Sequence, residues 1–166
     1  MKQFTPKGMK TLKTIHLLLI MMWTIGVVMM AILYWQPSSN SLQFLYNQQT
    51  AMLIDYSLVI PGAICAVITG ILYGLKTNWG FFKYRWLTVK WIVGISVILI
   101  GTFGLHPIAT EIIANLSPIA STDTHLPTDL FGAKLAVIKI MALVQGLVLI
   151  WLVYVSVFKP WKSTKK

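Results

Sequence analysis

The sequence predicts an all-α protein, a four-transmembrane-helix bundle in which residues 1–166 form a single integral membrane domain. Three observations lead to this fold class. Of the 166 residues, 57% are hydrophobic and only 11% are charged, whereas soluble domains carry about 25% charged residues. The apolar residues form four long runs, and the basic residues fall in blocks between them. Because the net charge of +10 is divided in this way, no nucleic acid is expected as a partner.

Each of the four apolar runs is long enough to cross the bilayer core, which takes about 20 helical residues. The predicted helices are residues 12–35, 51–75, 86–106 and 134–158. The first run follows lysines, as a signal peptide would, but it is too long for one and is expected to be a retained membrane helix. The connection 36–50 is predicted to be a loop, and residues 108–116 to form a short helix on the surface.

The basic residues also predict the orientation of the bundle. They precede the first run, lie between the second and third, and follow the fourth, while 36–50 and 107–133 contain no lysine or arginine. By the positive-inside rule both termini are cytoplasmic, and the plasma membrane is the expected location. The same basic blocks are expected to contact anionic lipid headgroups.

One face of the first predicted helix combines three features that suit a bound porphyrin. His16, Trp23 and Gly26 share this face, since helical residues seven and three apart lie above one another. They offer a metal ligand, a flat aromatic surface and a gap in the helix wall. A histidine inside a membrane helix needs a reason, and a hydrogen bond to a backbone carbonyl of another helix is the structural alternative.

The third predicted helix brings a cation to a similar depth. Lys90 lies a few residues inside the apolar run, and Gly94 is on the same face. The lysine can balance a carboxylate or extend to the headgroups. A neutral histidine is a common ligand of heme iron. Together the two helices predict a heme b site, with His16 as the metal ligand and Trp23, Gly26, Lys90 and Gly94 around the macrocycle.

A second polar cluster is expected at the opposite side of the membrane. Its members are Asp55, His106 and Lys139, with Glu111 and Lys134 nearby. A carboxylate inside a membrane helix normally has a partner, so Asp55 is predicted to pair with Lys139 or Lys134. His106 and His16 cannot ligate one heme, because their separation approaches the bilayer thickness.

Other kinds of site find little support in the residues. Cys65 is the only cysteine, so no internal disulfide can form. No His, Cys, Asp and Glu residues have zinc-like spacing, and there is no phosphate-binding glycine loop. Small residues at every fourth position of the second predicted helix, from Gly62 to Gly74, indicate a close helix–helix contact.

Short motifs in three of the four predicted helices resemble those of known membrane proteins. The pattern Lys-x2-His-x6-Trp-x2-Gly, which begins at Lys13, resembles the first helix of HemJ-type protoporphyrinogen oxidases. It is also similar to the CopD copper-resistance family and to uncharacterised bacterial integral membrane proteins. Residues 61–70 and 86–90 resemble the Pro-x-Gly and Trp-Leu-x-x-Lys segments of the HemJ type. The resemblance implies a four-helix heme b protein with His16 as iron ligand and Lys90 near the site.

The chain departs from the HemJ pattern in ways that favour heme binding over catalysis. After Gly26 it lacks the Leu-Pro-Arg-Leu segment of that family, and no histidine follows Lys90 at mid-helix. The four-helix plan also resembles small heme-sensing or heme-sequestering membrane proteins of the HsmA kind, which implies that the protein holds or senses heme. The alternatives are porphyrinogen oxidation, copper handling, and a role as a partner subunit in a homo-oligomer or with another membrane protein.

Overall fold

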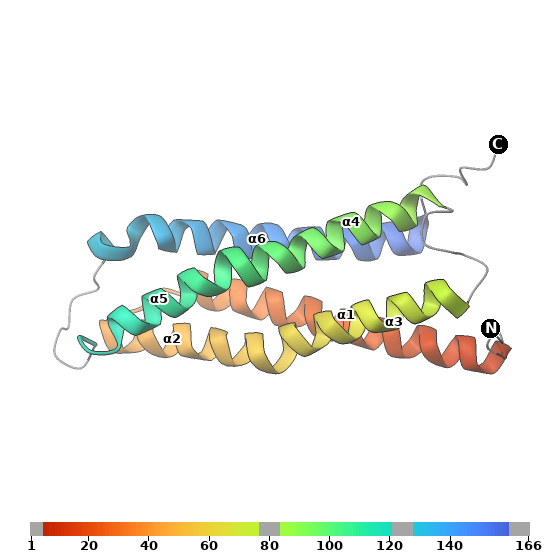
Figure 1. Ribbon diagram of the computed structural model, residues 1–166. Coiled ribbons are helices and arrows are strands. Elements are labelled where there is room, and N and C mark those ends of the chain that lie inside the picture. The colour runs from red at the N-terminus through yellow and green to blue at the C-terminus, as the bar shows by residue number, and fades with distance from the viewer. Residues whose placement is uncertain (1–4, 77–83, 121–127, 160–166) are drawn as a thin grey trace.

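A computed structural model describes residues 5–76, 84–120 and 128–159, and all regular elements in these ranges are helices. The helices run side by side in an elongated bundle (Figure 1). Four stretches are long and apolar enough to cross a membrane: Pro6–Trp35, Ser41–Lys76, Arg85–Leu116 and Phe131–Phe158. The predicted all-α fold with four such helices is confirmed, and it suggests a multi-pass membrane protein.

Two of the four stretches are continuous helices with a π-helical segment in the middle, labelled η1 and η2. In chain order the elements are α1 (Pro6–Trp35), α2 (Ser41–Ile54), η1 (Asp55–Val59), α3 (Ile60–Lys76), α4 (Arg85–Leu99), η2 (Ile100–Leu105), α5 (His106–Leu116) and α6 (Thr128–Phe158). The start of α1 and the end of α6 lie together at what we call the basal end (Figure 1). At the opposite, distal end, α5 contacts both α2 and α6.

Apolar side chains form one core at each end of the bundle. The distal core comprises Ala31, Tyr34, Phe44, Leu45, Ala51, Ala109, Ile112, Leu116, Ala120, Phe131, Ile138 and Ala142. The basal core comprises Trp23, Val27, Ala63, Ala66, Val97, Leu149 and Leu152. The basal core is the smaller of the two, and a pocket lies beside it.

The predicted loop over 36–50 is wrong, because helix α2 begins at Ser41. The side chain of Asn40 caps this helix by accepting a hydrogen bond from the backbone N–H of Gln43 at 2.8 Å, which satisfies an N–H that has no partner within the helix. Phe44 and Leu45 are buried against the rest of the distal core. The second helix is therefore longer at its start than the predicted 51–75.

The prediction of a separate surface helix over 108–116 is also wrong. Residues 106–116 continue the third long helix, which was expected to end at 106. Ile112 and Leu116 are fully buried in the distal core. The first and fourth helices likewise begin earlier than the predicted 12 and 134, at Pro6 and Thr128.

A proline lies two residues after the end of each π-helical segment. Pro61 is the second residue of α3, and Pro107 is the second residue of α5. Proline has no backbone N–H and its ring clashes with the carbonyl four residues earlier, so the regular α-helical bonding is interrupted there. The chain instead makes five-residue bonds, from the N–H of Ile60 to the carbonyl of Asp55 and from the N–H of His106 to the carbonyl of Gly101.

Candidate functional site

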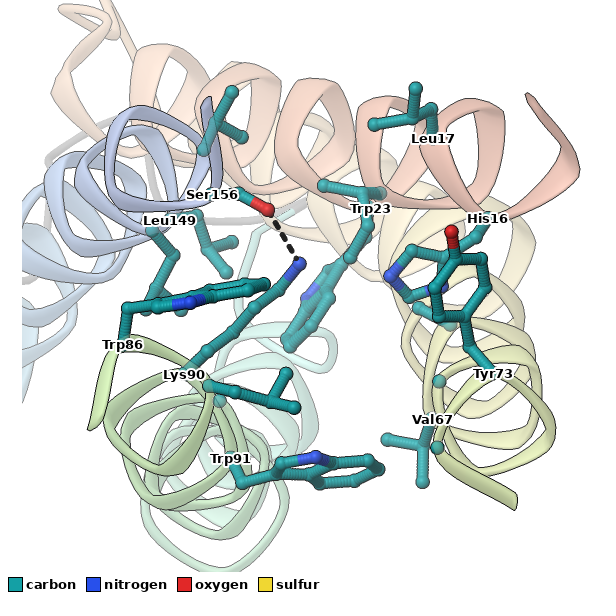
Figure 2. Close-up of a pocket in the computed structure, with 18 of the residues that line it drawn as sticks. His16, Leu17, Trp23, Val67, Tyr73, Trp86, Lys90, Trp91, Leu149 and Ser156 are labelled. Carbon is teal, nitrogen blue, oxygen red and sulfur yellow. Dashed lines mark hydrogen bonds between the residues drawn. The ribbon is translucent and has the colours of Figure 1, made fainter. Parts of the chain in front are cut away.

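A pocket of about 470 Å³ lies at the basal end between α1, α3, α4 and α6. Most of its wall is apolar, but His16 and three lysines, Lys13, Lys90 and Lys159, also line it. In Figure 2, His16 and Tyr73 lie on one side of this basal pocket, and Lys90 and Trp86 lie on the other. None of the described residues that line it is acidic, so the charges at its wall favour an anionic ligand.

The tautomer of His16 follows from its contact with Thr69. The Nδ1 atom of His16 lies 2.8 Å from the Thr69 hydroxyl oxygen. That hydroxyl donates its one hydrogen to backbone carbonyls of its own helix, 2.7 Å from the oxygen of Cys65 and 3.1 Å from that of Ala66. It therefore accepts from His16, which carries its hydrogen on Nδ1 and keeps a lone pair on Nε2.

A histidine in this state is prepared to bind a metal. Ligating histidines usually donate their other ring N–H to a fixed acceptor, which sets the tautomer and the ring orientation. Thr69, with 9% of its surface exposed, provides such an acceptor. Sequence reasoning missed Thr69, although it lies on the small-residue face of its helix, three residues after Ala66.

Lys90 reaches across the pocket from α4. Its Nζ donates a hydrogen bond to the Ser156 hydroxyl at 3.1 Å (Figure 2). Among the described residues, no carboxylate is within ion-pair distance of Lys90. A hydroxyl cannot neutralise an ammonium group, so this cation is available to an anion in the pocket. Ser156 was not predicted, but a lone serine in an apolar run was a signal for it.

Aromatic side chains form much of the remaining wall. Trp23 and Trp86 are 5% and 7% exposed, and the Lys159 ammonium lies 5.6 Å from the centroid of the Trp86 ring. The Trp91 ring lies on the α3 side of the pocket, where a Cβ on Gly70 would be 3.5 Å from it. These flat surfaces suit a planar ligand.

Of the residues predicted from sequence, the structure brings His16, Trp23, Lys90 and Gly94 to the basal pocket. Beyond its own helix, no atom of the described residues lies within 4 Å of a Cβ built on Gly94, so the wall is open there. Gly26, which was predicted to lie beside the ligand, is not among the residues that line the pocket. A Cβ on Gly26 would lie 2.7 Å from Val59, because this glycine lets α1 pack against η1.

The second predicted cluster is only partly assembled. Asp55 and His106 do meet, with 3.3 Å between Oδ2 and Nδ1. The predicted pairing of Asp55 with a lysine of the fourth helix is wrong, because Lys134 pairs with Glu111 and the Lys139 ammonium lies 5.9 Å from the centroid of the Trp35 ring. Both members of this pair lie at a π-helical segment, since Asp55 begins η1 and His106 directly follows η2.

No known protein family, curated protein or solved structure matches this chain. Within residues 5–76, 84–120 and 128–159, no three His, Cys, Asp or Glu side chains are grouped as metal ligands. The described part of the chain therefore contains no cluster of such ligands that would support copper handling.

Proposed function

We propose that this protein binds heme b in the basal pocket, with Nε2 of His16 as an iron ligand. One observation carries the proposal: an imidazole with its Nδ1 hydrogen held by Thr69 and a lysine without a described carboxylate partner face the same apolar pocket. The imidazole offers a lone pair to iron, and the lysine offers a charge to a propionate.

The residues present fit this group in size, shape and charge. The pocket volume of about 470 Å³ falls within the range of small-molecule and cofactor sites, about 300–1,000 Å³. Trp23, Trp86 and Trp91 supply flat apolar surfaces for a macrocycle. Lys13, Lys90 and Lys159 can pair with carboxylates, which need a cation when they leave water.

The protein is proposed to hold or sense heme rather than to catalyse a reaction. Bound heme supplies an iron centre that can change its oxidation state. The chain contributes the ligand, the apolar enclosure and the cations. Oxidation of a porphyrinogen remains the alternative and would need a group that removes protons from the substrate. His16 is assigned to iron, so it is not available for that role. The other polar side chains of the basal pocket are lysines, Tyr73 and Ser156, and none of them is a carboxylate or a second histidine.

Titration of the purified protein with hemin tests the proposal. In detergent or lipid nanodiscs, we expect saturable binding of one heme per chain and a Soret band displaced from that of free hemin. Metal-free protoporphyrin IX serves as a second ligand, because it fills the pocket without an iron–nitrogen bond. If neither porphyrin binds, the proposal is wrong and the bundle is better regarded as a partner subunit.

We expect Lys90→Met to weaken hemin binding without moving the Soret band. Loss of a charge-assisted contact typically costs about 1.5–3 kcal/mol, or about a 10–100-fold rise in Kd. The band position depends on groups bound to iron, which a propionate partner does not touch. Absorption titrations of the wild type and this variant measure both quantities, with Lys139→Met as the control. A band shift in Lys90→Met would make the lysine an iron ligand itself.

The orientation of the bundle is part of the proposal. Both termini are assigned to the cytoplasm and the distal end to the outer side of the plasma membrane, because the basic residues flank the basal ends of the helices. In a Cys65→Ala background, a cysteine at exposed Ser39 should react with an impermeant maleimide on intact cells. A cysteine at exposed Thr11 should react only after lysis. The reverse labelling pattern would invert the topology.

A further inference from the structure

Where α2 joins α3 and α4 joins α5, three polar side chains form a continuous chain through one imidazole ring. The His106 Nδ1 atom lies 3.3 Å from Oδ2 of Asp55, and its Nε2 atom lies 3.3 Å from the Tyr56 hydroxyl. When Asp55 is ionised its carboxylate can only accept, so in that state Nδ1 carries the hydrogen and donates it to Oδ2. Nε2 then accepts from the hydroxyl of Tyr56.

The two ends of this chain face different surroundings. The Tyr56 side chain is on the outside of the bundle, with 55% of its surface exposed. Asp55 and His106 line a small inner cavity of about 70 Å³, which we call the distal cavity. One water occupies about 30 Å³, so the cavity has room for about two. The cavity wall also contains the side chains of Tyr34 and Gln145, which can hydrogen-bond to such waters.

The two π-helical segments place the members of this chain. Asp55 and Tyr56 are the first residues of η1, and His106 directly follows η2. A π-helical turn contains one residue more than a regular α-helical turn, so it rotates the face on which the next side chains lie. Such turns are rare, and they occur often at functional sites. Both helices that carry the three side chains contain such a turn. This indicates that the three-residue contact is a specific feature of the fold.

The chain lies where the helices leave the apolar core of the membrane. The stretches from Asp55 to Lys76 and from Arg85 to His106 each rise about 31 Å at 1.5 Å per residue. That distance equals the thickness of the hydrocarbon core, about 30 Å. With the basal ends of these helices at the inner headgroups, Tyr56 and His106 therefore lie at the outer boundary, within reach of water.

We propose that Tyr56, His106 and Asp55 form a proton relay between the outer surface and the distal cavity. A proton from outer water joins the Tyr56 oxygen as the hydroxyl hydrogen moves to Nε2 of His106. The Nδ1 hydrogen moves to Oδ2 of Asp55 and can pass on to a water in the cavity. Tyr56 is unchanged, His106 ends as the opposite neutral tautomer, and the reverse sequence restores the start.

The surrounding groups are compatible with this path. Tyr34 from α1 is the only other titratable side chain among the described residues that line the distal cavity. Helix α6 contributes Ala142 and Gln145, which carry no charge. Trp23 and Ile98 line both the distal cavity and the basal pocket. The relay thus ends one layer of side chains from the basal pocket, but it does not depend on heme being bound there.

A pH jump followed by time-resolved infrared absorption tests the relay. The full-length, heme-free protein in phosphatidylcholine nanodiscs is acidified with a photoreleased proton. We expect a carboxyl signal that disappears in Asp55→Asn. In Tyr56→Phe the same signal should reach its full amplitude but form at least tenfold more slowly, because proton uptake at His106 has lost its hydroxyl. Tyr56 is exposed, so this variant should fold.

The control is Glu111→Gln, which removes the exposed carboxylate paired with Lys134 and should leave both the Asp55 amplitude and its rate unchanged. A wild-type rate in Tyr56→Phe would overturn the relay. So would the absence of any Asp55 carboxyl signal across the accessible pH range, which would leave the three side chains with a structural role only. Repeating the measurement with hemin bound separates this result from the heme proposal, since the relay should titrate in both forms.

Discussion

His16→Ala is expected to abolish the displaced Soret band or to shift it strongly. The substitution removes the nitrogen proposed to bind iron, while the walls and the lysines of the basal pocket remain. Absorption titration with hemin measures the loss. Metal-free protoporphyrin IX should still bind to this variant, because the pocket can hold the macrocycle without a bond to iron.

The matched control for this substitution is His106→Ala, which removes the other described histidine and should leave the Soret band in place. If His106→Ala loses heme and His16→Ala does not, the heme site lies at the distal end and the proposal is wrong. Thr69→Val refines the test, because it keeps the shape of the side chain and removes the hydroxyl that holds Nδ1 of His16. Loss of such a supporting contact typically weakens metal binding about 10–100-fold, and Thr69→Ser should restore it.

Gly62→Ala is expected to destabilise the bundle, because the added methyl group meets the backbone of another helix. A Cβ at Gly62 would lie 3.0 Å from the backbone nitrogen of Trp23 and 3.1 Å from its Cα. A backbone atom cannot rotate away as a side chain can, so α1 and α3 would have to separate. Overpacking of this kind typically costs about 1–3 kcal/mol, and thermal unfolding in detergent should show a lower midpoint.

The matched control is Gly94→Ala on α4, where, beyond that helix, no atom of the described residues lies within 4 Å of the added Cβ. We expect its midpoint to stay close to that of the wild type, since alanine also has the higher helix propensity. Equal losses in both variants would mean that the effect comes from replacing any helical glycine. In that case the close contact of α1 with α3 would not be the cause.

Hydropathy was sufficient to predict the four long helices, because each has an apolar stretch as long as the membrane is thick. It could not predict where the second helix begins, since α2 carries polar residues such as Gln43 and Asn47 among its apolar ones. The cap on that helix depends on the side-chain conformation of Asn40. A polar segment such as the start of α2 becomes helical because it packs against other helices at the end of the bundle. Its composition alone is that of a loop.

The site residues likewise divide into those that the sequence could predict and those that it could not. His16 and Lys90 could be chosen from the sequence because a charged or ligating side chain is rare inside an apolar helix. Their partners Thr69 and Ser156 depend on how the helices dock, which single-helix patterns do not contain. Asp55 was paired with a lysine because a carboxylate inside a membrane helix needs a partner. The partner in the structure is His106, and its position beside Asp55 depends on how the two helices dock.

The helices are longer than the membrane is thick, which implies that different forces hold the two ends of the bundle together. In the proposed orientation the outer boundary of the membrane lies near His106, so most of α2 and α5 would stand in water and the hydrophobic effect would favour burial of Ile112 and Leu116 there. In the same orientation the basal core would be surrounded by lipid, which is as apolar as its side chains, so close packing would have to hold it. Urea and temperature should therefore loosen the distal end first, with the heat-capacity change of a small soluble domain, while the basal end stays assembled.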